Sequence, residues 1–330
     1  MSEIEKIAKQ MVAKGKGILA ADESTGTMTK RLSSVSVEST SENRLKFRET
    51  LFSAEGMKNY IGGVILYDET IKQKTLSGKT IPELIKSFGS IPGIKVDTGA
   101  KKLANSPNEK ITEGLDGLRD RLIEYFDLGA RFAKWRAVIN INEALPSIGC
   151  ILANTHALAR YAALCQENGL VPIVEPEVLM DGSHDVNRCY EVTCKTLDIL
   201  FDQLSNQNVL LEGIVLKPNM VISGLMCSEQ SDVDKVADLT VKCFMEHVPE
   251  TVSGIAFLSG GQSSDVATEH LNAMNSNYTN LPWNLTFSYG RALQHDALNA
   301  WSGKNRSDGQ TALLKRAKNN SLATKGKYQK

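Results

Sequence analysis

The sequence has no excess of charge of either sign. Its 330 residues carry 38 lysines and arginines against 38 aspartates and glutamates, which gives a formal net charge of zero at pH 7. No block of like charges stands out along the chain. Nucleic acids and anionic membranes are bound largely through positive patches, so we expect neither as a partner. Any bound anion must therefore be held by local geometry.

Long uncharged apolar runs are also absent. The first residues, Met1–Lys6, include acidic side chains and lack the apolar stretch of a secretion signal. Nowhere does an uncharged apolar run approach the roughly 20 residues that a membrane-spanning helix needs. These features predict a cytoplasmic protein.

Cysteine and histidine are few, at six and five residues. No two cysteines form a Cys-x-x-Cys pair, which favours buried reduced thiols over a disulfide framework or a zinc site. His184, followed by Asp185, has no second ligand at metal-binding spacing, so we interpret it as solvated or structural. No metal is predicted.

Eight short runs rich in apolar and β-branched residues recur along the chain, starting about 30 to 45 residues apart. They are residues 17–22, 62–67, 93–98, 132–139, 171–178, 212–218, 254–260 and 284–290. Between them, apolar residues recur with helical spacing, for example Val192, Leu197, Leu200, Phe201 and Leu204, and again Val233, Val236, Leu239, Cys243 and Phe244. Repeated strand–helix units of this number predict an α/β fold, a closed (β/α)8 TIM barrel.

The length alone admits one domain or two, but no linker or change of composition divides residues 1–330, so we predict a single domain. Residues 33–43 and 105–113 are polar enough to be long surface loops. A last helix is expected at about 308–322, followed by a short basic tail, residues 323–330, that we expect to be mobile.

Charged residues interrupt several predicted strands, although strands of a parallel barrel are normally apolar. These residues are Asp22, Lys95, Asp97, Lys134, Arg136, Glu175, Glu177 and Lys217. Residues two apart in a strand share a face, so the pairs 134/136 and 175/177 each point one way. Buried ion pairs that hold the strands together are the alternative, but such pairs seldom stabilise more than apolar packing does. We therefore predict an active site at the carboxyl ends of the strands.

Lysines and carboxylates around one cavity favour chemistry on a carbonyl group. A lysine amine attacks a carbonyl only when neutral, and nearby ammonium groups and burial lower its pKa toward that state. Lys217, followed by Pro218, fits this role, with Lys134 as the neighbour expected to destabilise its charge. The carboxylates would then act as general acid and base.

Two segments have the composition of phosphate sites. After the seventh run comes Ser259-Gly260-Gly261, and after the eighth Ser288-Tyr289-Gly290-Arg291, which are the loops that bind phosphate in many barrels. After the first run, residues 22–27 include Ser24 and Thr27 and precede Arg31. An ordinary helix N-cap explains this second segment equally well.

At these residues the chain resembles class I fructose-bisphosphate aldolases, the Schiff-base type. The matching segments are GILAADESTGT (17–27), GGVILYDET (62–70), GIKVDTG (93–99), FAKWR (132–136), NGLVPIVEPEVL (168–179), LKPNMV (216–221), FLSGGQS (257–263) and LTFSYGRALQ (285–294). The resemblance implies a (β/α)8 barrel, a homotetramer, and no metal or organic cofactor. It also implies reversible cleavage of fructose 1,6-bisphosphate into dihydroxyacetone phosphate and glyceraldehyde 3-phosphate, as in glycolysis and gluconeogenesis.

The resemblance assigns roles to individual residues. Lys217 becomes the Schiff-base lysine, Glu175 the acid and base of imine formation, and Asp22 the base at the C4 hydroxyl, with Lys134 and Glu177 as their supporting partners. The residues implied around the substrate are Ser259, Gly260, Gly290 and Arg291 at the C1 phosphate, with Ser288 in the same loop, and Ser24, Thr27 and Lys95 at the other phosphate, with Arg31 and Arg136 along the channel.

The chain departs from the family pattern in two places. Thr27 stands where serine is common, which keeps the hydroxyl. Family members commonly continue into a flexible tail ending in tyrosine that assists proton exchange on the enamine, whereas this sequence stops at Gln329-Lys330. We expect carbon–carbon cleavage to persist and enamine protonation to depend on another group or on solvent.

Two rival interpretations remain. A transaldolase or deoxyribose-phosphate aldolase would also use a barrel lysine, but two separated phosphate sites argue against it. A binding or scaffold protein is the other, although the retained strand charges favour an enzyme. The sequence leaves open the preference among fructose 1,6-bisphosphate, fructose 1-phosphate and the seven-carbon bisphosphate.

Overall fold

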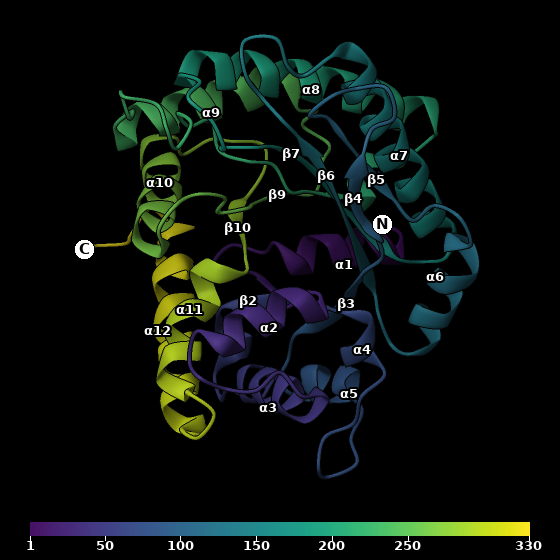
Figure 1. The fold of residues 1–330 in the computed structure, drawn as a ribbon, viewed down its shortest axis with the longest axis vertical. Helices are drawn as coiled ribbons and strands as arrows, with labels where there is room; N and C mark the ends of the chain where they lie inside the picture. The colour runs from purple at the N-terminus through teal and green to yellow at the C-terminus, as the bar shows by residue number, and fades with distance from the viewer.

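Eight parallel strands close into a barrel in the computed structural model, which describes residues 1–330 (Figure 1). The order around the barrel is β1-β10-β9-β8-β7-β6-β3-β2. The strands are β1 (Gly17–Ala20), β2 (Ile61–Leu66), β3 (Ile91–Lys95), β6 (Phe132–Ile139), β7 (Val171–Val178), β8 (Val215–Leu216), β9 (Ile255–Phe257) and β10 (Leu285–Tyr289). Six of the eight predicted runs contain a whole strand, whereas β2 begins one residue before run 62–67 and β3 two residues before run 93–98. The predicted (β/α)8 barrel is confirmed.

Helices surround the barrel and follow most of its strands. They are α1 (Glu3–Met11), α2 (Thr25–Ser33), α3 (Ser41–Phe52), α4 (Asp68–Ile71), α5 (Ile81–Ser87), α6 (Leu118–Asp127), α7 (Ile148–Glu167), α8 (Val186–Asn206), α9 (Val233–His247), α10 (Ser264–Asn277), α11 (Arg291–Trp301) and α12 (Arg306–Ala323), with short 3-10 turns at Met57–Asn59 and Leu211–Gly213. No helix is both long and apolar enough to span a bilayer.

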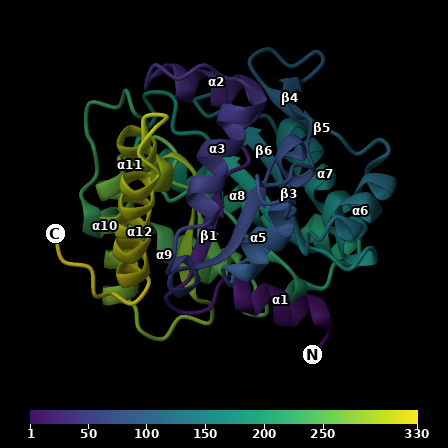
Figure 2. The ribbon, with the colours of Figure 1, turned by 90° about the horizontal axis from the view of Figure 1, so that it is seen from below.

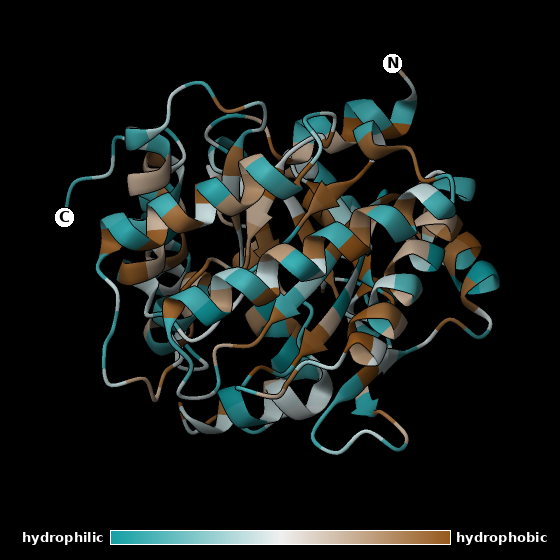
Figure 3. Cartoon of the chain, turned by 90° about the horizontal axis from the view of Figure 1, so that it is seen from above, coloured by the Kyte–Doolittle hydropathy of each residue, from teal (hydrophilic) through white to brown (hydrophobic).

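The predicted apolar stripes face the barrel. In α8, Val192, Leu197, Leu200 and Leu204 are buried, and in α9 so are Val236, Cys243 and Phe244. Figure 3 shows hydrophobic and hydrophilic residues alternating along the helices, with hydrophobic colouring on strands of the barrel. Both helices begin after an aspartate whose carboxylate accepts a hydrogen bond from a first-turn N–H. Such caps satisfy backbone donors that the helix itself leaves unpaired.

Helix α1 closes one end of the barrel. Its residues Ile7, Ala8 and Met11 form one apolar cluster with inward-facing strand residues such as Ile18 and Val215. Figure 2 shows α1 at one end of the molecule and α2 at the other. The interior is therefore filled with apolar side chains near α1, and the inward charges lie toward the opposite, carboxyl end of the strands.

The loop prediction for residues 105–113 is partly wrong. Strand β5 (Lys110–Glu113) pairs antiparallel with β4 (Gly99–Lys102) as a hairpin outside the barrel. The preceding Glu109 is buried because its carboxylate accepts bonds from the backbone N–H and hydroxyl of Ser147, at 2.7 and 2.6 Å. The other predicted loop is shorter than residues 33–43, since α2 ends at Ser33 and α3 begins at Ser41.

The C-terminal helix matches the prediction, and the tail after it makes several contacts. The buried Thr324 hydroxyl accepts a bond from the Gly15 N–H at 3.1 Å. Further along, the Tyr328 N–H donates to Asn272 Oδ1 at 2.9 Å, and Lys330 pairs with Glu269 at 2.8 Å. The tail therefore contacts the rest of the chain at these residues, and its mobility remains a prediction.

Candidate active site

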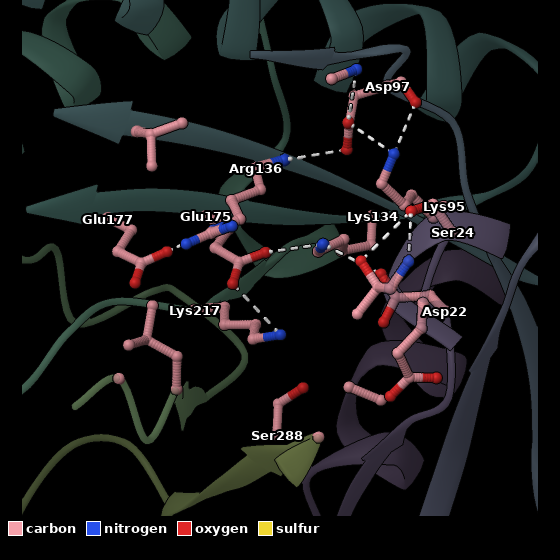
Figure 4. Close-up of a pocket in the computed structure, with 18 of the residues that line it drawn as sticks. Asp22, Ser24, Lys95, Asp97, Lys134, Arg136, Glu175, Glu177, Lys217 and Ser288 are labelled. Carbon is pink, nitrogen blue, oxygen red and sulfur yellow. Dashed lines mark hydrogen bonds and ion pairs between the residues drawn. The ribbon is translucent and has the colours of Figure 1, made fainter. Parts of the chain in front are cut away.

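A cavity of about 630 Å³ opens at the carboxyl ends of the strands. All fifteen residues predicted to act on or bind the substrate line it: Asp22, Ser24, Thr27, Arg31, Lys95, Lys134, Arg136, Glu175, Glu177, Lys217, Ser259, Gly260, Ser288, Gly290 and Arg291. Figure 4 shows the charged members pointing toward one another from different strands. The sequence thus predicted where the site lies, whereas the individual roles remain predictions.

Four charged groups form a continuous row across the cavity floor. The Lys134 ammonium lies 3.0 Å from Asp22 Oδ2 and 3.2 Å from Glu175 Oε2, and Lys217 Nζ lies 3.2 Å from Glu175 Oε1 (Figure 4). Glu175 therefore lies between two ammonium groups. All four side chains are nearly buried, so each charge depends on its neighbours rather than on water.

Lys217 is placed by the end of β8. Its N–H donates to the Val174 carbonyl at 2.8 Å, which continues the pairing of β8 with β7 one residue beyond the strand. The next residue, Pro218, accepts a bond through its carbonyl from Leu258. These bonds fix the backbone at Lys217, and the amine of its side chain lines the cavity.

Burial and ion pairing act in opposite directions on the acids of the row. Burial favours the neutral form of Asp22, but Lys134 and Lys217 outweigh it and lower the pKa of Asp22 to about 2. Burial likewise opposes ionisation of Glu175, and the same two lysines bring its pKa below the usual value. For Lys134, burial is outweighed by Asp22 and Glu175, which raise its pKa. Asp22 and Glu175 are thus ionised at neutral pH and can accept protons.

Glu177 differs from Glu175. Its carboxylate pairs with the Arg136 guanidinium, yet burial dominates and raises the pKa of Glu177 above its ordinary value. Two glutamates on the same face of β7 therefore have pKa values shifted in opposite directions. Glu177 therefore holds a proton more readily than Glu175 does.

Donors for an anion gather after β9 and β10. The Ser288 hydroxyl is buried without a partner inside the protein and points into the cavity (Figure 4). Helix α11 begins after Gly290 with no side-chain cap, so its first N–H groups are not capped from within. A helix N-terminus with unpaired donors is a favourable place for a phosphate. Arg291 lines the same side of the cavity.

The segment after β1 forms the predicted helix cap and also lines the cavity. Ser24 caps α2, with its hydroxyl accepting from the Thr27 N–H, and the two hydroxyls lie 3.2 Å apart. Both residues nevertheless line the cavity with Lys95. Lys95 Nζ is held by Asp97, at 2.7 Å from its carbonyl oxygen and from Oδ1. The helix cap is thus observed, and its two hydroxyls lie in the same cavity as Lys95, where an anion site remains a prediction.

A family model described as fructose-bisphosphate aldolase class-I matches residues 3–330. The chain belongs to the class I fructose-bisphosphate aldolase family. The family's Schiff-base chemistry, in which a lysine activates the ketose and no metal takes part, makes it a carbon–carbon lyase, as the sequence predicted. No group of three or more histidines, cysteines, aspartates or glutamates is arranged to hold a metal ion.

Curated relatives from distant organisms agree with this assignment. The chain is 56% identical over 331 residues to a probable fructose-bisphosphate aldolase class 1 of Xanthomonas axonopodis pv. citri, with 99% of each chain covered. It is 52% identical over 328 residues to fructose-bisphosphate aldolase B of Gallus gallus, covering 98% of this chain and 90% of the relative.

A solved structure is similar over nearly the whole fold. It is a ternary complex of fructose-bisphosphate aldolase from Plasmodium falciparum with TRAP and a small-molecule inhibitor. The TM-score is 0.98 at 47% identity, with 99% of this chain and 95% of that one covered.

Two acids of this aldolase's cavity received no role from the sequence. Glu23 is buried and pairs with Arg31, while Gln294 Nε2 donates to the same Glu23 oxygen at 2.8 Å. Asp97 holds Lys95 and also accepts from the Gly99 N–H at 3.1 Å. Asp97 could have been found from its i, i+2 spacing to Lys95, whereas nothing local to Glu23 signals that it turns inward.

His184 is buried, and neither ring nitrogen has a partner within the protein. Burial lowers its pKa, so the ring is neutral at neutral pH. Of the two alternatives for this residue, the structural one therefore holds.

Proposed function

We propose that Lys217 forms the Schiff base through which this class I aldolase reversibly cleaves fructose 1,6-bisphosphate into dihydroxyacetone phosphate and glyceraldehyde 3-phosphate. The observation that carries the assignment is the buried Lys217 amine 3.2 Å from Glu175, in a cavity flanked by two clusters of anion donors. In this position the Lys217 amine can attack the substrate carbonyl, and the neighbouring Glu175 carboxylate can transfer the protons that the reaction requires.

Imine formation requires two proton transfers beside Lys217. Glu175 takes the proton that the amine must lose before it attacks the C2 carbonyl, and the resulting carbinolamine then loses water with a proton returned by the same carboxyl. The ionised Glu175 carboxylate can accept the first proton, and its contact with Lys134 holds it in place. Glu177, whose pKa is raised, supports the acid step.

Cleavage of the C3–C4 bond then requires a base at the C4 hydroxyl, and we assign this to Asp22. As Asp22 accepts that proton, the aldehyde forms and leaves, and the bonding electron pair moves into the iminium to give the enamine. Lys134, 3.0 Å from Asp22, keeps the carboxylate ionised and oriented. In this assignment the row of four charges serves both chemical steps.

The two phosphates would fix the position of the substrate along the cavity. Ser259, Gly260, Ser288, Gly290 and Arg291 would hold the phosphate on C1, because the uncapped start of α11 and the unpartnered Ser288 hydroxyl meet there. Ser24, Thr27 and Lys95 would hold the other phosphate, with Arg31 and Arg136 along the channel. Lys217 lies between the two sites.

Reduction with borohydride in the presence of dihydroxyacetone phosphate tests the assignment of Lys217. We expect a stable adduct on Lys217, mapped by peptide mass spectrometry, and no turnover by Lys217→Met. Lys95→Met is the matched control. It removes a different lysine of the same cavity and should still be labelled on Lys217. Labelling of a different lysine, or turnover retained in Lys217→Met, would reject the assignment.

We further propose a homotetramer in the cytoplasm. Support for the location comes from relatives named as cytoplasmic in Spinacia oleracea, at 51% identity, and as cytosolic in Arabidopsis thaliana, at 52%. Sedimentation equilibrium should give four times the 36.1 kDa of one chain. The neutral charge balance supports the expectation that neither nucleic acid nor membrane is a partner.

A further inference from the structure

Two cysteines that the aldol reaction does not use lie in direct contact between helices α8 and α9. Cys194 Sγ and Cys243 Sγ are 2.9 Å apart, and both residues are buried. The other four cysteines have no cysteine partner, and Cys227 is the only one of the six that is not buried. A disulfide bond measures about 2.05 Å, so the two sulfurs need to approach by only about 0.9 Å to bond.

We propose that Cys194 and Cys243 are an oxidisable dithiol that hydroperoxides convert into a disulfide linking α8 to α9. The two residues are 49 positions apart in sequence and belong to helices that pack side by side around the barrel (Figure 1). The link would join the helix after β7, which carries Glu175, to the helix after β8, whose end carries Lys217.

The surroundings make the two thiols unequal. Contact with the Cys243 thiol is the main cause that lowers the pKa of Cys194, and nearby His247 acts in the same direction. Contact with Cys194 and burial raise the pKa of Cys243. Cys194 is thus the nucleophile and Cys243 the resolving thiol, because the thiolate is the reactive form.

Small oxidants have a short way to the pair. Tyr190 lies one helical turn before Cys194, and His247 one turn after Cys243, so each shares a helix face with a thiol. Both side chains are only partly buried, and they bond to acids at the surface: Tyr190 to Glu246 and His247 to Asp198, each at 2.6 Å. Outward rotation of either ring exposes a sulfur to a peroxide without unfolding a helix.

The reaction balances with the peroxide as its oxidant. The Cys194 thiolate attacks one peroxide oxygen, the O–O bond breaks, and an alcohol or water leaves, so that Cys194 becomes a sulfenic acid. Cys243 sulfur then attacks Cys194 sulfur, and the displaced hydroxyl takes the Cys243 proton and leaves as water. Two electrons pass from the two thiols to one peroxide.

Peptide mapping of the folded protein treated with a few equivalents of hydrogen peroxide tests the proposal. After free thiols are blocked, trypsin and Glu-C release residues 192–195 and 243–246 as separate peptides and also divide Cys189 from Cys194 at Glu191. We expect these two peptides joined and lighter by two hydrogens than their sum, with the link reversed by a thiol reductant. Recovery of both cysteines as free thiols, or as separate sulfinic acids, while Cys227 is oxidised would overturn the proposal.

Thermal unfolding adds a second readout. Oxidised wild-type protein and the control Cys227→Ser should unfold several degrees above their reduced forms, because a link across 49 residues restricts the unfolded chain. Cys243→Ala should show no such shift, and turnover should stay within about twofold because the pair lies on outer helices. If Cys243→Ala does not fold, the mapping of wild-type protein still decides the question. If the disulfide forms but the unfolding temperature does not rise, the link between α8 and α9 does not stabilise the fold, and this part of the proposal is rejected.

Discussion

At the scale of single residues, the chemistry depends on how Glu175 shares its two oxygens. One oxygen faces Lys217 and the other faces Lys134, each at 3.2 Å. Loss of either ammonium would leave the buried Glu175 carboxylate with only one ion-pair partner, which would destabilise the fold. The same geometry that keeps Glu175 ionised therefore also places it beside the amine whose proton we propose that it accepts.

The low pKa of Asp22 makes stability depend on acid pH. Its folded pKa is about 2 against an ordinary 3.8, so its ionisation stabilises the fold fully above about pH 4, and this stabilisation is lost as the pH falls toward 2. The shift corresponds to about 2 kcal/mol. Asp22→Asn should be less stable than wild type at pH 6, and the difference should shrink below pH 4.

Urea unfolding at a series of pH values measures this effect. The control is Asp116→Asn on a loop outside the row of charges, which should follow the wild-type profile. A difference between Asp22→Asn and wild type that stays constant from pH 6 to pH 2 would contradict the depressed pKa.

Two hydroxyls should separate the two phosphate sites. Ser288→Ala removes the unpartnered donor assigned to the C1 phosphate, so KM should rise about tenfold or more for both fructose 1,6-bisphosphate and fructose 1-phosphate. Thr27→Ala should raise KM for the bisphosphate alone, since fructose 1-phosphate lacks the second phosphate. Steady-state kinetics with the two substrates provide the measurement, and the opposite pattern would exchange the two assignments.

At the scale of elements, the side chains of Met180 and Glu177 leave little room beside Gly260 in the loop after β9. A Cβ on Gly260 would lie 2.0 Å from Met180 Cε and 3.1 Å from Glu177 Oε1. The Met180 methyl can move aside, but the Glu177 carboxyl belongs to the site and is paired with Arg136. The loop therefore needs glycine to bring its backbone close to both the acid and the substrate.

Gly260→Ala should raise KM for fructose 1-phosphate about tenfold, because the loop must shift away from its place at the phosphate. Gly26→Ala is the matched control: its added Cβ meets no atom within 4 Å, and it lies in the first turn of α2. This control should leave kinetics unchanged and stability equal or slightly higher. Equal kinetics for both variants would show that the loop tolerates a side chain at residue 260.

At the scale of the whole molecule, the segment before β1 contacts the end of α12. Gly15, before β1, donates to Thr324 Oγ1 at 3.1 Å and accepts from the Ser321 hydroxyl at 2.7 Å. Helix α12 also holds the start of α10, since the buried Arg316 bonds to Asp265 and Thr268. The C-terminal segment is thus part of the barrel's support.

Thr324→Val keeps the side-chain shape and removes the acceptor for the buried Gly15 N–H. An unsatisfied buried donor costs about 1–3 kcal/mol, so the free energy of unfolding should fall by that amount. Lys330→Ala, which removes an exposed ion pair of the same segment, should leave the unfolding midpoint unchanged. Equal stability of both variants in urea unfolding would show that the ends do not depend on this bond.

Much of the architecture could be predicted because its signals are local. Strand-forming runs about 40 residues apart predict a barrel, and charges within runs such as 132–139 and 171–178 predict which end carries the site. The hairpin at residues 99–113 was missed because its polar side chains find partners on distant segments: Glu109 accepts from Ser147, just before α7, and Thr112 donates to the Arg136 carbonyl on β6. Nothing in the local pattern signals those contacts.

The sequence by itself determined which charged residues gather at one end of the barrel, because Lys217, Glu175 and their neighbours lie in or directly after strands that are otherwise apolar. Only the tertiary structure decided which charges pair. In the register of β6 and β7, Arg136 lies opposite Glu175, yet Arg136 pairs with Glu177 and Lys134 with Glu175. Strands of a closed barrel are tilted and staggered, so side chains meet partners farther along the neighbouring strand, and that offset exists only once the barrel has closed.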